Sequence, residues 1–161
     1  MLTIGFSGGI NNVHDVTYPH DTQLGHDSAA VLVEDGVVVA AIEQERLDRI
    51  KHSNKRSSQA IRACLDIHGV RASDVDAFAY YNDESFTDFI IRDMYLHNGK
   101  LPPMKSIRAF FRDNLSADLG VDIDADKINF VDHHQCHAVS ALAMSTFDTG
   151  LIITLDRKSV V

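Results

Sequence analysis

Two apolar runs joined by a tight turn constrain the fold of this chain more than any other feature. Residues 28–33 and 37–42 flank Glu34-Asp35-Gly36, and a short turn containing glycine between two such runs predicts a β-hairpin. A third apolar run, over residues 2–6, precedes the hairpin and predicts an earlier strand. Three successive strands are therefore expected to begin a sheet.

Helices and strands are expected to alternate along the rest of the chain. The pattern predicts strands over residues 77–81, 128–131 and 151–155, and helices over residues 59–68, 84–97, 107–119 and 134–144. Ser57 and Ser58 should cap the first of these helices, which Gly69 ends. This order predicts one mixed α/β domain. It resembles the ribonuclease-H-like core that is duplicated in sugar kinases, actin and the heat-shock chaperone ATPases.

Composition and charge limit which partners and which cellular compartment are expected for this chain. A net charge of -8 argues against a broad electrostatic contact with nucleic acid or an anionic membrane. The two cysteines, Cys64 and Cys136, suggest no disulfide framework. The start of the chain lacks the features of a signal peptide, and no apolar run approaches the roughly 18 residues of a membrane span. We therefore expect a cytoplasmic protein.

His133 and His137 are the clearest candidate metal ligands. They stand four residues apart where a helix is expected to follow a strand, so their side chains should share one helical face and can share one divalent metal. Asp156, at the end of the next predicted strand, is a candidate third ligand. Alternatively, the histidines cap the helix and pack under a loop. His134 should face away from the pair, and Cys136 should pack in the core.

Two further segments carry candidate site residues with alternative explanations. His26 and Asp27 follow Gly25 at the entry to the hairpin, where His26 could exchange a proton with a bound oxygen. A local turn stabilised by Asp27 is the alternative. In residues 43–52, Arg46 and Lys51 could clamp an anion, and a solvated surface segment with internal salt bridges is the alternative.

These motifs, in this order, resemble the N-terminal half of the nodulation and antibiotic O-carbamoyltransferase family. The resemblance depends on the first strand, on the hairpin entry Gly-His-Asp-Ser-Ala-Ala with its tail Glu-Gln-Glu-Arg-Leu-Asp-Arg-Ile-Lys-His, and on the histidine motif over residues 132–138. It also includes Thr154-Leu155-Asp156. The family is related to the tRNA threonylcarbamoyladenosine synthase and to the hydrogenase-maturation carbamoyltransferase.

The resemblance implies roles for the candidate residues and for their cofactors. In the family, carbamoyl phosphate and ATP form carbamoyl-adenylate in a C-terminal domain, and the metal-bearing N-terminal domain transfers the carbamoyl group to a small-molecule or sugar hydroxyl. His133, His137 and Asp156 are then ligands of a divalent metal, commonly iron, with zinc or manganese as alternatives. The resemblance also implies that His26 and Asp27 are catalytic, and it makes Arg46, Lys51 and His52 substrate or anion contacts.

The chain departs from the family pattern in two places. Residues 10–24 form a longer connection than usual. Where family members continue after Leu-Asp with a Gly-rich turn, this chain continues Arg157-Lys158-Ser159-Val160-Val161. We therefore expect residues 1–161 to be a fragment without the second lobe, a further metal ligand and the adenylating domain.

Two other functional classes fit parts of the sequence. An Asp-His-His metallophosphoesterase would explain Asp132-His133-His134 after a strand, but such enzymes need carboxylates at the tips of the first strands, and residues 6–9 offer none. The other alternative is a binding lobe that keeps the fold without catalysis.

Overall fold

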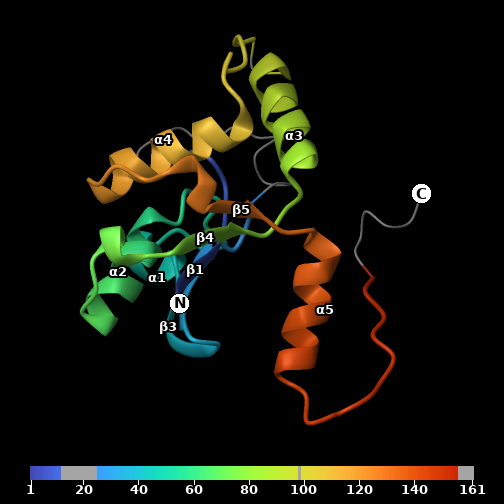
Figure 1. Ribbon diagram of the computed structural model, residues 1–161. Coiled ribbons are helices and arrows are strands. Elements are labelled where there is room, and N and C mark those ends of the chain that lie inside the picture. The colour runs from blue at the N-terminus through green and yellow to red at the C-terminus, as the bar shows by residue number, and fades with distance from the viewer. Residues whose placement is uncertain (12–24, 98, 156–161) are drawn as a thin grey trace.

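The computed structural model describes residues 1–11, 25–97 and 99–155. Figure 1 shows a central sheet with helices on both sides. The strands are β1 (Leu2–Ser7), β2 (Ala29–Glu34), β3 (Val37–Glu43), β4 (Ala77–Tyr80) and β5 (Ile128–Phe130). The α-helices are α1 (Glu45–Asp48), α2 (Ser58–His68), α3 (Glu84–His97), α4 (Ile107–Leu119) and α5 (His133–Ala143), and two short 3-10 helices, η2 (Ala72–Asp74) and η3 (Ala125–Lys127), precede β4 and β5.

The sheet is mixed and has the order β3-β2-β1-β4-β5. β1 pairs antiparallel with β2, which pairs antiparallel with β3, whereas β1, β4 and β5 run parallel. The turn between β2 and β3 has positive φ at both Asp35 (49°) and Gly36 (86°), as the twist of a two-residue hairpin requires. The predicted hairpin and the mixed α/β class are confirmed.

One face of the sheet forms the core with α2 and α4. Along β1, Leu2, Ile4 and Phe6 are buried and alternate with half-buried residues, which is the period of a strand with two different faces. Phe111 of α4 packs against the Phe6 and Tyr80 rings, with centroids 6.2 and 4.6 Å away. Burying each large apolar side chain of this kind stabilises the fold by about 1.5–3 kcal/mol.

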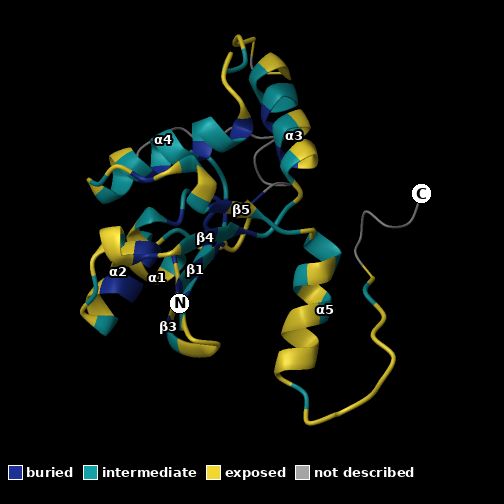
Figure 2. Cartoon of the chain, in the orientation of Figure 1, coloured by how far each residue is buried: buried dark blue, intermediate teal, exposed yellow. Residues whose placement is uncertain are grey.

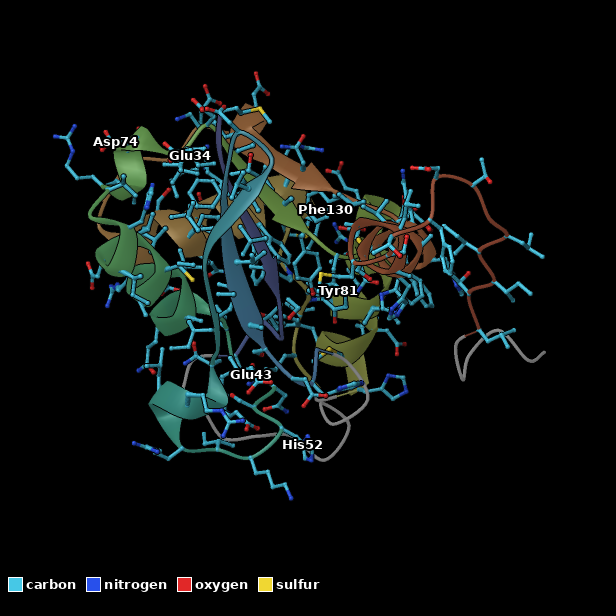
Figure 3. The ribbon with its side chains drawn as sticks, turned by 90° about the horizontal axis from the view of Figure 1, so that it is seen from below. Glu34, Glu43, His52, Asp74, Tyr81 and Phe130 are labelled. Carbon is cyan, nitrogen blue, oxygen red and sulfur yellow. The ribbon has the colours of Figure 1, made fainter. Side chains whose placement is uncertain are left out.

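The opposite face of the sheet is only partly covered. Many of its residues are small, among them Gly5, Ala29, Ala41 and Ala79, and Val31 and Tyr81 lie beside them. α5 lies on this side, opposite α2 (Figures 1 and 3). Figure 2 shows that α5 and the segment after it are largely exposed. The face with the small side chains is therefore open to a ligand or to another part of a larger protein.

The predicted strand over residues 151–155 is wrong for this chain. The segment has no helix or strand, and Leu151 (87% exposed) and Leu155 (88% exposed) face solvent. A strand needs a hydrogen-bonding neighbour, and none of the described strands pairs with this segment. An apolar run indicates that a strand would be buried, but it does not supply the partner.

The start of α2 differs from the prediction in how it is capped. Ser57 occupies the N-cap position, but its side chain makes no capping hydrogen bond. The fully buried Gln44 does so instead, because its Oε1 accepts a hydrogen bond from the Ala60 N–H at 3.0 Å. An orphan N–H of the first turn is thus satisfied from the end of β3. The predicted end of the helix is confirmed by Gly69, with φ of 75°.

The helices of the described residues include none that is both long enough and apolar enough to span a bilayer.

Candidate functional site

The predicted site residues come from segments that meet at one edge of the sheet. The carboxyl ends of the parallel strands β1, β4 and β5 lie there, since Phe6 is opposite Tyr80 and Tyr80 is opposite Phe130. The start of β2 and the end of β3 lie at the same edge, because Ala29 is opposite both Ser7 and Glu43. His26 and Asp27 precede β2, Arg46 and His52 follow β3, and His133 follows β5. The topology therefore collects segments that are far apart in sequence.

Asp27 bridges two histidines at this edge. Its Oδ2 lies 2.7 Å from His26 Nδ1, and its Oδ1 lies 2.8 Å from His52 Nδ1. The hydrogen bond from His52, followed by the one from His26, lowers the pKa of the Asp27 carboxyl below its ordinary value. An ionised carboxylate only accepts hydrogen bonds, so both Nδ1 atoms donate and the Nε2 of each neutral ring keeps its lone pair.

Gly25 allows His26 and Asp27 to lie at the edge of the sheet. It has φ of 75°, and a Cβ on it would lie 2.5 Å from Gly9 N and 2.6 Å from Gly8 C. Only glycine allows the hairpin entry to pass so close to the end of β1.

The charged segment after β3 is anchored by buried polar groups. Ser28 N–H donates to Ser53 O at 2.9 Å, and Gln44 N–H donates to Ser28 O at 2.7 Å. The Ser28 hydroxyl donates to Lys55 O at 2.5 Å. Because buried polar groups need partners, these bonds fix residues 44–55 against the start of β2. The charged side chains of residues 43–52 are nevertheless largely exposed and Arg46 pairs within the segment, as the alternative of a solvated, salt-bridged segment predicts.

Arg46 and Lys51 lie on exposed parts of that segment. Arg46 Nε lies 3.0 Å from a Glu43 carboxylate oxygen, and its guanidinium is 3.5 Å from Glu45. An incoming anion would have to exchange with these exposed pairs, which are weak.

His133 and His137 share one face of α5, as their spacing predicts. Their Nε2 atoms lie 3.2 Å apart, and their ring centroids lie 4.5 Å apart. Two nitrogens about 2.1 Å from one ion, at an angle between about 90° and 110°, are separated by about 3.0–3.4 Å. The pair therefore fits chelation of a single divalent metal, as well as a direct imidazole–imidazole hydrogen bond.

The neighbours of this pair have other roles. Asp156 lies outside the described residues. His134 turns away, with Nδ1 at 3.2 Å from the Thr154 hydroxyl. Burial raises the pKa of the Cys136 thiol, which disfavours the thiolate that a metal would need. Asp132 is the N-cap of α5 and accepts a hydrogen bond from the Gln135 N–H at 2.8 Å. The capping alternative thus applies to Asp132, not to the histidines.

A groove of about 690 Å³ runs over the open face of the sheet. Glu43 and Arg46 line it at the end of β3, and Cys136 lines it from α5. Tyr81, labelled in Figure 3, also lines the groove. Its ring meets His133 edge to face, with centroids 5.4 Å apart. The volume is that of a small-molecule site.

Sequence analysis missed two residues of this region. From the sequence, Gln44 is only part of a charged run, whereas in the fold it is fully buried. The sequence predicts Tyr81 as the end of a strand, and in the structure it directly follows β4. Its position at the carboxyl end of a parallel strand is the signal that could identify it. Burial raises the pKa of the Tyr81 phenol, which therefore stays a hydrogen-bond donor.

Comparison with known proteins gives the family of this chain. Residues 22–159 match the family described as the carbamoyltransferase N-terminus. Over 156 residues, the chain is 40% identical to the nodulation protein NolNO of Sinorhizobium fredii, an alignment that covers 97% of this chain. It is 38% identical over 102 residues to an uncharacterised 19.2 kDa protein of Rhizobium etli, which covers 63% of this chain and 60% of that protein.

A third relative is an uncharacterised protein of Synechocystis, 33% identical over 145 residues, with 81% of this chain covered. The chain spans 23% of the length of NolNO and 24% of that of the Synechocystis protein. The family match extends from the segment before Gly25 to beyond the histidine pair, and so it includes every candidate site residue. The chain belongs to the carbamoyltransferase N-terminal family.

Proposed function

We propose that this chain is the first, ribonuclease-H-like lobe of an ATP-dependent O-carbamoyltransferase. The observation that carries the proposal is that two groups of histidines follow or precede strands at one edge of the sheet, in a chain of this family. One is His26, whose Nδ1 is held by the Asp27 carboxylate. The other is the pair His133 and His137, whose spacing suits one metal ion. The order β3-β2-β1-β4-β5 with an antiparallel β2 supports the fold. Carbamoyl-adenylate, formed from carbamoyl phosphate and ATP in a C-terminal domain, would be the donor.

The proposed reaction transfers the carbamoyl group to a hydroxyl of a small molecule or sugar. The hydroxyl oxygen forms a bond to the carbamoyl carbon, and the bond from that carbon to the phosphate oxygen of AMP breaks with its electron pair. His26 Nε2 takes the hydroxyl proton, because Nδ1 is held by Asp27. Arg46 and Lys51 contact the departing anion, and His52 can join them only when its ring is doubly protonated.

Charge also develops on the carbamoyl oxygen in this reaction. His133 and His137, with Asp156, would hold a divalent metal, with iron as the first candidate and zinc or manganese as alternatives. Such an ion supplies Lewis-acid stabilisation of the oxygen. Tyr81 would keep the His133 ring in place through their edge-to-face contact.

The test uses a full-length protein that carries this domain. With carbamoyl phosphate, ATP and a panel of hydroxylated acceptors, we expect a carbamoylated product and release of AMP. His26→Gln should lower turnover by about 10²–10⁴-fold. His68→Gln is the matched control, because His68 also contacts a carboxylate, Glu34 at 3.2 Å, but at the other end of β2. A protein that forms neither product nor carbamoyl-adenylate would refute the proposal.

The metal site can be tested in the 161-residue chain itself. His137→Ala should abolish binding of ferrous or zinc ion in calorimetry, whereas His134→Ala should leave it nearly unchanged, because only His137 shares the face of His133. If His134 proved essential, the assigned ligand pair would be wrong.

The structure does not favour the metallophosphoesterase alternative. It needs Asp132 as a metal ligand, but this carboxylate caps α5. In the described residues, β1 ends in Ser7 and is followed by Gly8, so neither supplies a carboxylate at its tip.

A further inference from the structure

We propose that His52 is a positioning residue, which holds the Asp27 carboxylate and thereby selects the tautomer of His26. This inference rests on the proposed function, since it concerns the imidazole that would take the acceptor's proton. It assigns His52 a role through Asp27 and not primarily through contact with an anion.

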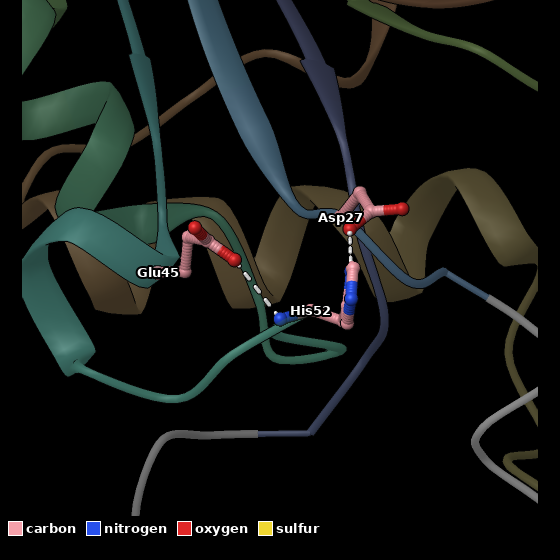
Figure 4. A group of neighbouring side chains, drawn as sticks. All are labelled: Asp27, Glu45 and His52. Atoms are coloured by element: carbon pink, nitrogen blue, oxygen red, sulfur yellow. Dashed lines mark hydrogen bonds and ion pairs between the residues drawn. The ribbon is translucent and has the colours of Figure 1, made fainter.

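The contacts form a continuous chain from α1 to the hairpin entry (Figure 4). Glu45 Oε2 accepts a hydrogen bond from the His52 backbone N–H at 2.9 Å. The His52 side chain then donates from Nδ1 to Asp27 Oδ1 at 2.8 Å. Asp27 Oδ2 is left to the Nδ1 of His26, 2.7 Å away. Each oxygen of the carboxylate therefore has its own imidazole.

A second contact matters because Asp27 is exposed. Its side chain is 57% accessible, and that of His26 is 63% accessible. An isolated exposed pair of this kind is weak, and its side chains are free to rotate. With His52 bonded to Oδ1, rotation of the carboxylate would break a second hydrogen bond. Oδ2 consequently stays directed at His26, whose proton is kept on Nδ1 and whose Nε2 is kept as the acceptor.

The backbone supports the same interpretation. Asp27 and His52 both have positive φ, 55° and 53°, a conformation that is unfavourable for residues other than glycine. Such strain persists where surrounding bonds determine it. Here the bond from Ser28 N–H to Ser53 O, at 2.9 Å, joins the residues that follow Asp27 and His52. The fold thus holds the Asp27 and His52 side chains next to each other.

A cation is the competing occupant of this cluster. Asp27, Glu45 and His52 each offer one potential metal-ligand atom, and these three atoms lie within 4.8 Å of one another. The His52 Nδ1, however, carries the proton that it donates to Asp27, so a metal bound at Nδ1 would require that proton to leave. The two arrangements therefore differ in the protonation of one atom.

The experiment measures ring-nitrogen resonances of the 15N-labelled 161-residue chain, at about pH 8 so that ordinary imidazoles are neutral. In the wild-type chain, the Nδ1 and Nε2 signals of His26 should be well separated, with Nδ1 protonated. In His52→Leu, which removes the donor, they should move toward each other as the tautomers mix. His52→Gln retains an N–H donor and should restore most of the wild-type separation. Amide spectra confirm that each variant is folded.

His68→Gln is the matched control, because it removes a histidine–carboxylate contact at the other end of β2. It should leave the His26 signals unchanged. Unchanged His26 signals in His52→Leu would overturn the proposal. So would loss of the His52 Nδ1 proton on addition of one equivalent of zinc at the Asp27 cluster, which would show a cation site. Neither readout depends on carbamoyl transfer, so this inference and the proposed function can fail separately.

Discussion

Replacing Gly25 by alanine tests the close packing that places His26 and Asp27 at the site. The added Cβ would lie 2.5 Å from Gly9 N, 2.6 Å from Gly8 C and 2.7 Å from Gly9 Cα. These are backbone atoms, so the β1 end or the hairpin entry must move. We expect overpacking of this kind to cost about 1–3 kcal/mol. The left-handed backbone, with φ of 75°, adds about 1–2 kcal/mol for a residue with a Cβ.

Gly69→Ala separates the two contributions. Gly69 also has φ of 75°, but a Cβ there meets nothing within 4 Å. Urea unfolding of both variants should therefore show Gly25→Ala to be less stable than Gly69→Ala by about 1–3 kcal/mol. The His26 amide resonance should also shift in Gly25→Ala and not in Gly69→Ala. Equal unfolding free energies for the two variants would refute the proposed steric role of Gly25.

Three further predictions follow from the same contacts. Gln44→Ala should lower the unfolding free energy by about 1–3 kcal/mol, because it leaves the Ala60 N–H without its hydrogen-bond acceptor. Gln59→Ala removes only the exposed partner of the Gln44 amide. It should therefore lower the unfolding free energy by less in the same urea titration. The pKa of Asp27 is lowered in the folded chain, so its contribution to stability is complete above its ordinary value of about 3.9 and is lost as the pH falls through the lower folded value. Asp27→Asn should therefore weaken the rise of stability with pH in the acid range, and an unchanged slope would contradict the assigned hydrogen bonds. The 161-residue chain alone should show no carbamoyl transfer, because the proposed donor, carbamoyl-adenylate, forms in a separate domain. Measurable turnover in a product assay would overturn the proposed division of labour between domains.

Local signals in the sequence were sufficient for most of the elements. The hairpin follows from Asp35-Gly36, whose positive φ values few other residue pairs accept. The helices α3 and α4 follow from the predicted ranges, residues 84–97 and 107–119, with the same bounds in the structure. The shared face of His133 and His137 follows from helical periodicity alone. Each of these depends on neighbours within a few residues.

Contacts between distant segments could not be obtained in this way. Nothing near Gln44 in sequence shows that it caps α2, because the Ala60 N–H comes from a helix that packs against β3 only in the fold. The same holds for Asp27 and His52, which lie 25 residues apart and meet because β2 and β3 pair antiparallel.

The predicted strand over residues 151–155 shows the converse limit. Its apolar residues suit a buried strand, yet no described strand pairs with it. The sequence by itself determined the local elements, the spacing of the histidine pair and the family resemblance. Only the tertiary structure decided which side chains share a hydrogen bond at the sheet edge and which strands have partners. The physical reason is that backbone conformation depends on near neighbours, whereas burial and pairing depend on groups brought together by the whole fold.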